Sequence, residues 1–313
     1  MVTAELSARV EAWCVRALGP GSLTSLQAVA GGQMSTPFRY DSEEHGAVAV
    51  KVRPESAARI NRCLQIHKIA KDAGFPCARP VVNAEPLGPG WVASAEEWLP
   101  GGEMHTGGGL PFAERSARLL AELAGILQSQ SPAGLGTPPP WMHWNPPTGG
   151  LWPPNRAVDD KDQDLVPRHV HTIARAVSER LGRTALPVVV GHGDWESQNL
   201  RWKGKRAWAV HDWDSLVALP EAAIVGAAAG AFASTALPSL ASVEDSKEFI
   251  ACYEQARGRL FSEDEHEVAW AASLWPALHN ARGESLFHSE SVALSAVTEQ
   301  ASERLQRAGV RRK

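Results

Sequence analysis

The sequence predicts an α+β protein with a small β-rich N-terminal part and a larger, mainly helical C-terminal part. Short apolar stretches separated by turn residues dominate before residue 99, which is typical of strands. After residue 100, apolar residues recur every three or four positions over long segments, which is typical of helices. Pro100-Gly101-Gly102 interrupts the chain between these two patterns and indicates a linker. We therefore expect two domains, residues 1–99 and residues 100–313.

The N-terminal domain is expected to contain two helices and five short strands. Apolar residues recur at helical spacing over 5–18 and over 55–73. Gly74 is expected to end the second helix, where a left-handed cap is commonly needed. The strands are expected at 26–30, 38–40, 47–52, 81–82 and 91–98.

The C-terminal domain is expected to be built from helices around a central β segment. Its loop 131–157 is rich in proline and tryptophan and is expected to be irregular. The β segment starts at 188–190, and alternating apolar residues in 200–202 and 208–210 predict a hairpin. The helices are expected at 112–129, 163–181, 220–237, 243–257, 263–282 and 290–308.

Composition and charge exclude several classes of protein. Hydrophobic residues make up 44% and charged residues 21%, so the chain can bury a core and is not disordered. The net charge of -4 offers no basic excess for nucleic acid or for an anionic membrane. The cysteines form no C-x-x-C pair, which argues against a disulfide framework or a structural zinc site. We find neither a signal peptide nor a membrane-spanning segment, so we expect a cytoplasmic protein.

The most informative segment surrounds His192-Gly193-Asp194. A buried strand leads into a loop that carries Asp194 and Asn199, and the hairpin turn near residue 205 would place Asn199 almost opposite Asp212. Two carboxylates and an amide oxygen suit Mg²⁺. The spacing D-x-x-x-x-N is also that of the kinase template, in which the Asp accepts a hydroxyl proton and the Asn and a later Asp hold Mg²⁺ on the nucleotide phosphates.

Lys51 and a glycine-rich stretch indicate where phosphates could bind. Lys51 lies on the apolar strand 47–52, where a buried ammonium needs a partner that a nucleotide phosphate would supply. Gly31, Gly32, Gln33 and Ser35 precede it between two strands, and such backbone can approach phosphates closely. Two simpler interpretations stay open: an edge lysine whose ammonium reaches water, and a plain hairpin turn.

Together these stretches resemble the aminoglycoside phosphotransferase and choline kinase-like family, which shares the bilobal protein-kinase-like fold. The resemblance implies an ATP site between the two lobes, with 96–99 as the hinge and Glu97 and Leu99 in contact with the nucleotide. It further implies that Asp194 is the catalytic base and that Lys51 binds the α- and β-phosphates. The implied Mg²⁺ ligands are Asn199 and Asp212.

One departure from the family pattern concerns Lys51. The family usually pairs this lysine with a glutamate on the next helix, but the only acids between Lys51 and Gly74 are Glu55 and Asp72, near the helix ends. Either the pair is missing or another group replaces the glutamate. An inactive relative that binds nucleotide is therefore one alternative.

The acceptor is the least determined part of the prediction. Tryptophan is frequent, and aromatic faces can stack on sugars or attract ammonium groups, while carboxylates favour cationic or polyhydroxyl compounds. We expect an ATP- and Mg²⁺-dependent kinase that phosphorylates a hydroxyl of a sugar, amino sugar or aminoglycoside-like acceptor. The residues expected to contact the acceptor are Trp195, Glu196, Asp214, Glu221 and Trp275. The other alternative is a metal-dependent phosphohydrolase built on His192, Asp194, His211, Asp212 and Asp214.

Overall fold

The computed structural model describes residues 4–25, 36–146, 149–155, 157–235 and 237–310, and the chain divides into two compact units. The first unit comprises Met1–Gly102 together with Trp208–Asp214, and the second comprises Glu103–Ala207 together with Ser215–Lys313. The expected linker therefore lies where the chain first leaves the first unit. The segment Trp208–Asp214, expected in the C-terminal domain, belongs instead to the first unit.

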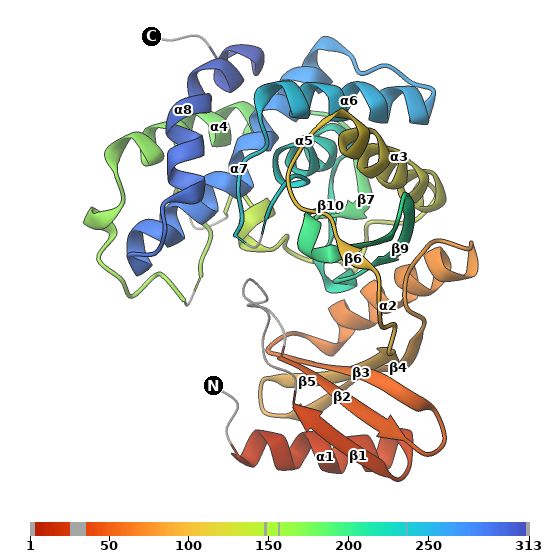
Figure 1. Ribbon diagram of the computed structural model, residues 1–313. Helices are drawn as coiled ribbons and strands as arrows, with labels where there is room; N and C mark the ends of the chain where they lie inside the picture. Colours follow the sequence, from red (N-terminus) through yellow and green to blue (C-terminus); the bar gives the residue numbers. More distant parts are fainter. Residues whose placement is uncertain (1–3, 26–35, 147–148, 156, 236, 311–313) are drawn as a thin grey trace. The chain divides into compact units, whose positions relative to one another are not determined.

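A five-stranded antiparallel sheet forms the centre of the first unit (Figure 1). Buried and half-exposed residues alternate along its strands, as the two-residue period of a strand requires. Four of the five predicted strands are confirmed, and the one expected at 26–30 lies outside the described residues. In sheet order, the strands are β1 (Gly21–Ser25), β2 (Thr36–Ser42), β3 (Gly46–Arg53), β5 (Trp91–Glu97) and β4 (Pro80–Gly88).

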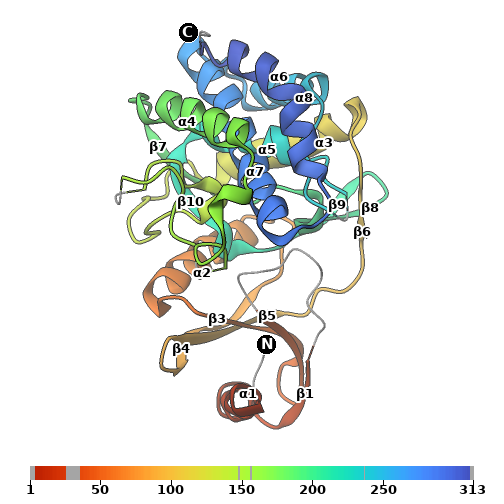
Figure 2. The same cartoon turned by 90° about the vertical axis from the view of Figure 1, so that its left-hand side faces the viewer.

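Two helices cover opposite faces of this sheet, as Figures 1 and 2 show. Helix α1 (Ala4–Leu18) packs on one face, in a core cluster that includes Val50 of β3. Helix α2 (Ala57–Asp72) packs Leu64 on Val92 of the other face. Gly74 follows α2 with a φ of 89°, so the predicted left-handed residue at the end of this helix is confirmed.

The α2 face of the sheet also carries a row of polar side chains. In β3 and β5, Lys51 pairs in register with Ser94, and Arg53 pairs with Val92. Residues directly opposite in an antiparallel pair share a face, and so do residues two positions apart on one strand. Lys51, Arg53, Ser94 and Glu96 therefore all lie on the face that α2 covers.

The second unit is mainly helical, as predicted. Strand β7 (Val188–His192) pairs with β10 (Leu216–Pro220), while β6 (Glu103–Met104) and the predicted hairpin strands β8 (Leu200–Lys203) and β9 (Arg206–Val210) form a small sheet. The helices are α3 (Leu110–Leu127), α4 (Arg168–Gly182), α5 (Glu221–Ala231), α6 (Val243–Arg257), α7 (Glu263–Phe287) and α8 (Val292–Arg307).

Helix α5 lies at the centre of the second unit, beside α3, α6 and α7 (Figure 1). Its residues Ala222 to Gly230 are all buried, so the helix is apolar on every side. At Gly226, a Cβ atom would collide with the backbone carbonyl oxygen of Ala269 on α7. Glycine at this position therefore lets the two helices approach closely.

Three helix boundaries differ from the prediction by more than two residues. The helix expected over 220–237 ends at Ala231, because an all-apolar sequence carries no periodic signal of its end. The helix expected from 163 begins only at Arg168, after a separate 3₁₀ turn and Pro167. Helix α7 continues through Pro276 to Phe287, beyond the predicted end at 282.

Among the described residues, no helix is both long enough and apolar enough to cross a membrane.

Candidate active site

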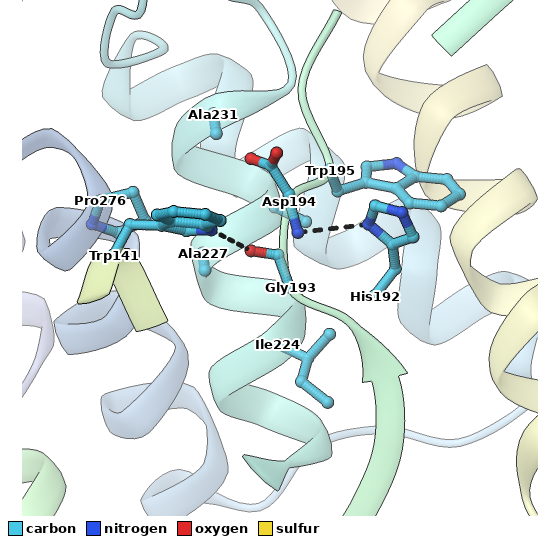
Figure 3. A pocket seen from close by; sticks show the side chains of 10 residues that line it. Trp141, His192, Gly193, Asp194, Trp195, Ile224, Ala227, Ala231 and Pro276 are labelled. Carbon is cyan, nitrogen blue, oxygen red and sulfur yellow. Dashed lines mark hydrogen bonds between the residues drawn. The ribbon is translucent and has the colours of Figure 1, made fainter. Parts of the chain in front are cut away.

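Strand β7 delivers Asp194 to the edge of a pocket in the second unit (Figure 3). His192 pairs in register with Leu216 of β10, and the Gly193 N–H donates to the Ser215 carbonyl at 2.8 Å. A Cβ on Gly193 would approach the Val217 side chain to 2.6 Å, so glycine is required for the strand to stay paired up to Asp194. The catalytic candidate is thus anchored by a strand on its N-terminal side.

Asn199 holds Asp194 from its C-terminal side. The Asn199 Nδ2 group donates to the Asp194 carbonyl at 2.9 Å and to the Asp194 carboxylate oxygen Oδ2 at 2.8 Å. The short 3₁₀ turn Ser197–Asn199 brings the amide back toward the aspartate. Because both bonds use the amide nitrogen, the oxygen of Asn199 lies on the opposite side of its amide, away from Asp194.

His192 supports the loop that carries Asp194. It is buried, its Nδ1 atom accepts a hydrogen bond from the Asp194 N–H at 3.2 Å, and its ring packs edge-on against Trp195. The Trp195 indole is also buried, and its Nε1 donates to the Ser116 hydroxyl at 3.0 Å. Trp195 borders the pocket, but its polar atom is directed into the packing of α3.

The walls of the pocket are mostly small and apolar. The Trp141 Nε1 group donates to the Gly193 carbonyl at 2.9 Å, which fixes the indole beside Asp194 (Figure 3). Nothing in the sequence marked Trp141 as a site residue, because it lies far away in the irregular loop and belongs to no motif. The remaining lining comes from the end of β7 and the loop after it, from α5 and from α7: His192, Gly193, Asp194, Trp195, Ile224, Ala227, Ala228, Ala231 and Pro276.

Glu196, predicted to contact the acceptor, interacts with Asp194. Burial raises the pKa of Glu196, although hydrogen bonds with Asp194 and Ser234 act in the opposite direction. Two carboxyl groups can share a hydrogen bond only when one of them holds a proton. One proton is therefore shared between Glu196 and Asp194 whenever this hydrogen bond forms.

Lys51 in the first unit lies between two carboxylates. Its Nζ atom is 3.3 Å from Glu96 Oε1 and 3.7 Å from Asp212 Oδ1. Burial alone would lower the pKa of Lys51, but these two carboxylates raise it above its ordinary value. Lys51 is therefore a charged ammonium throughout the physiological pH range.

The segment Trp208–Asp214 lies against α2 and the sheet of the first unit. The Val210 N–H donates to the Pro76 carbonyl at 2.7 Å, and the Trp213 ring stacks on His67 of α2 with 4.3 Å between ring centroids. These contacts fix Asp212, which has a φ of 65°. Left-handed backbone is uncommon outside glycine and is often found at functional sites.

Asp212 and Asp214 have opposite electrostatic environments. Burial and the neighbouring charge of Asp214 raise the pKa of Asp212 to about 7. Burial acts on Asp214 in the same direction, but the Arg53 guanidinium, with Nε 2.7 Å from Oδ2, holds the pKa of Asp214 well below its usual range. Asp214, predicted to contact the acceptor, is instead bound by Arg53 of β3.

Two other residues expected at the acceptor are engaged elsewhere in the second unit. Glu221 accepts from the Tyr253 hydroxyl at 2.7 Å and forms ion pairs with Arg257 and Arg259 at 3.1 Å each. Trp275 is completely buried within α7, so its face offers no surface on which a sugar could stack. Trp275 therefore packs in the helical core and does not form part of the stacking site that the frequent tryptophans suggested.

The predicted nucleotide contacts are described only in part. Glu97 ends β5, half of its side chain is exposed, and its Oε2 accepts from the Arg79 N–H at 3.0 Å. Leu99 follows in the connection to the second unit and is half-buried. The predicted glycine loop, with Gly31, Gly32, Gln33 and Ser35, lies outside the described residues.

In the part of the chain that the structure describes, no three His, Cys, Asp or Glu side chains gather closely enough to form a metal site by themselves. Any Mg²⁺ bound here would need an amide oxygen, water or phosphate oxygens among its ligands, which is common for this ion.

Comparisons with known proteins identify the family and the fold of the chain. Residues 25–223 match the model of the phosphotransferase enzyme family. No curated protein gives a significant match. The fold is also that of several solved kinases, so the predicted α+β, protein-kinase-like fold class is confirmed.

Three solved structures illustrate the similarity. Amicoumacin kinase in complex with AMP-PNP, Ca²⁺ and Ami has a TM-score of 0.64 at 12% identity, with 96% of this chain and 95% of that chain covered. A microcompartment-associated aminopropanol kinase has a TM-score of 0.63 at 14% identity, with 97% and 99% covered. Spectinomycin phosphotransferase in complex with ADP and spectinomycin has a TM-score of 0.54 at 13% identity, with 96% and 93% covered.

Proposed function

The chain belongs to the phosphotransferase enzyme family and is a small-molecule kinase, and we propose that it transfers the γ-phosphate of ATP, with Mg²⁺, to a hydroxyl of a sugar, amino sugar or aminoglycoside-like acceptor. The observation that carries this proposal is the Asp194 carboxylate, held by Asn199 at the edge of a pocket. Two of the kinases named above are crystallised with AMP-PNP or ADP, and the third is named an aminopropanol kinase, which supports a nucleotide donor and a small-molecule acceptor.

Asp194 would serve as the base that accepts the proton of the acceptor hydroxyl. In phosphoryl transfer most of the rate gain comes from positioning and from neutralising charge, so the base must be held in one orientation. The two hydrogen bonds from Asn199 and the strand pairing of β7 provide that orientation. The apolar pocket walls, with Trp141 fixed on the Gly193 carbonyl, would exclude water beside the carboxylate.

The first unit would hold the nucleotide. Lys51 would bind the α- and β-phosphates, while the glycine loop (Gly31, Gly32, Gln33 and Ser35) and the hinge residues Glu97 and Leu99 would contact the rest of the molecule. Because Lys51 is kept charged by its two carboxylate neighbours, it can attract a phosphate at every physiological pH.

The residues present fit a magnesium ion. Around Lys51 and Arg53, the three carboxylates of Glu96, Asp212 and Asp214 outnumber the two cations. This excess of negative charge, carried on hard oxygen atoms, favours a divalent cation. We assign the ligand roles to Asp212 and to the amide oxygen of Asn199. When bound, Mg²⁺ would neutralise charge on the nucleotide phosphates.

The test is ADP formation from Mg·ATP with a panel of aminoglycosides, hexosamines, other sugars, amino alcohols and nucleosides. One of these acceptors should stimulate ADP formation. Asp194→Asn should then lower kcat by about 10²–10⁴-fold, because the variant keeps the shape of the side chain and loses the base. Asp160→Asn, which changes an exposed aspartate of the same unit, is the matched control and should keep full turnover.

Other outcomes would favour the alternatives. Phosphate release from a generic phosphoester without ATP would support the metal-dependent phosphohydrolase. Tight nucleotide binding without transfer to any acceptor would support the non-catalytic relative. Near-full turnover of Asp194→Asn would contradict the role of Asp194 as base.

A further inference from the structure

Helix α2 does not provide a carboxylate for Lys51. Its own acid, Asp72, forms ion pairs with Lys68 at 2.6 Å and with Arg79 at 3.0 Å. Glu55, just before the helix, is paired with Arg59 and accepts from the Ser56 N–H. Both acids at the helix ends are therefore committed to other partners.

The buried side of α2 faces the site with side chains that carry no negative charge. Its buried residues are Ile60, Cys63, Leu64, Ile66, His67 and Ala70. His67 stacks on Trp213 with an interplanar angle of only 3°. Burial lowers the pKa of His67 to about 4, so this ring is neutral at physiological pH. The helix thus supports the Trp208–Asp214 segment by packing and leaves the lysine to another element.

Glu96 of β5 occupies the position that the helix leaves open. Lys51 lies opposite Ser94 across the β3–β5 ladder, and Glu96 is two residues further along the same face. Long side chains can span such a diagonal pair. Glu96 Oε1 lies 3.3 Å from Lys51 Nζ, and the two side chains are only 9% and 13% exposed.

We propose that Glu96 is the positioning residue for Lys51, which holds the ammonium toward the nucleotide phosphates in place of a helix glutamate. This inference rests on the proposed function, because it assigns Glu96 a task in nucleotide binding. Lys51 and Glu96 come from adjacent, hydrogen-bonded strands of one sheet, so the pair forms whenever the sheet forms. In protein kinases, movement of the corresponding helix controls this pair. Here both members of the pair belong to the sheet, so a shift of α2 would not by itself separate their side chains.

The neighbouring ion pair explains why Glu96 is available to Lys51. Arg53, the next residue on the same face of β3, donates to the Ser94 hydroxyl at 3.0 Å and is bound to Asp214 at 2.7 Å. Asp214 and Ser94 thus bind the guanidinium of Arg53, and Glu96 remains available to the ammonium of Lys51. The lysine retains a fixed carboxylate on the sheet even when Asp212 is engaged with a metal ion.

The test uses Glu96→Gln, which keeps the size of the side chain and removes its charge. We expect the dissociation constant of Mg·AMP-PNP, measured by calorimetry, to rise by about 10²-fold, because the ammonium is misplaced. For the same reason, kcat/KM for Mg·ATP should fall by about 10²-fold. In a Lys51→Met background, Glu96→Gln should add less than about threefold, because the group through which it acts is already gone. Glu85→Gln removes a carboxylate of β4 that pairs with Arg16 and should change neither quantity.

Melting temperatures of all variants separate loss of binding from loss of fold. If Glu96→Gln does not fold, Glu96→Asp is tested in its place. This variant keeps the negative charge but is one methylene shorter, so its carboxylate lies further from the Lys51 ammonium. It should bind the analogue about tenfold more weakly, and unchanged binding would overturn the inference.

The outcomes distinguish this inference from the proposed function. A parent protein that does not bind Mg·AMP-PNP would contradict both. If the parent binds Mg·AMP-PNP and Glu96→Gln binds it equally well, only the role of Glu96 is overturned. The same holds if Glu96→Gln weakens binding by the same factor in the parent and in the Lys51→Met background.

Discussion

Arg53 and Asp214 form a buried ion pair in which the stability of each charged side chain depends on the other. They are separated by 161 positions in the sequence, and their side chains are 5% and 8% exposed. A buried carboxylate that loses its guanidinium keeps the cost of desolvation and loses the attraction that offset it. Removing one partner of the pair is therefore costly, although the intact pair contributes only modestly to the free energy of folding. The pair holds the Trp208–Asp214 segment against β3.

We expect Arg53→Met to lower the free energy of unfolding by about 3–5 kcal/mol, because it leaves Asp214 buried and unpaired. Urea unfolding monitored by tryptophan fluorescence measures this change. Arg16→Met is the matched control, since Arg16 and Glu85 form an ion pair of similar length, 2.8 Å, whose side chains are 64% and 44% exposed. The control should cost less than about 1 kcal/mol, and equal losses in the two variants would contradict the argument.

The contact between α5 and α7 decides the packing at the scale of elements. A methyl group at Gly226 would collide with the Ala269 carbonyl, and one at Gly230 would collide with the Ser273 carbonyl. In both cases the neighbouring atom belongs to a helix backbone, which cannot move without the whole helix. Since α5 also lines the pocket beside Asp194, its position bears on the site as well as on stability.

Gly226→Ala should destabilise the protein by about 1–3 kcal/mol, because overpacking at the α5–α7 contact outweighs the better helix propensity of alanine. Gly283→Ala, within α7, is the matched control, since a Cβ there meets nothing within 4 Å. It should stabilise the protein by up to about 1 kcal/mol. Thermal unfolding compares the two, and a stabilising effect of both substitutions would show that α5 and α7 can separate at little cost.

The elements with clear periodicity could be predicted from the sequence, and those without it could not. Helix α6 was predicted with both of its bounds, whereas the end of the all-apolar α5 was missed. Asp194 and Asn199 could be singled out together because one loop holds both, and the structure joins their side chains by a hydrogen bond. The pairing of Lys51 with Glu96 depends on the register of two strands, which no local pattern specifies. Trp141 reaches the pocket only through the tertiary fold.

The stability of the whole molecule should depend on pH through His67. The pKa of His67 falls from 6.5 to about 4 in the folded protein because the ring is buried. Between these values the unfolded chain binds the proton and the folded chain does not, so the free energy of unfolding rises with pH across this window. The part of the free energy of unfolding that depends on the protonation of His67 is fully present above pH 6.5 and is lost by pH 4. The pKa difference of about 2.5 units corresponds to about 3 kcal/mol.

His67→Phe removes the titration and keeps a ring that can stack on Trp213. We expect the melting temperature of the variant to fall less than that of the parent between pH 7 and pH 4.5. Differential scanning calorimetry at several pH values measures both proteins. Parallel curves for the two would contradict the assignment of this pH dependence to His67.

The return of the chain to its first unit has a consequence for biosynthesis. A ribosome delivers residues in order, so a nascent chain that has emerged as far as Gly102 still lacks Trp208–Asp214. Until that segment is made, Arg53 has no Asp214 to bind and His67 has no Trp213 to stack on. Domains generally fold in the order of their synthesis. Here the unit translated first is completed only after much of the second unit has left the ribosome, so the contacts of Arg53 and His67 with this segment form late, between residues far apart in the sequence.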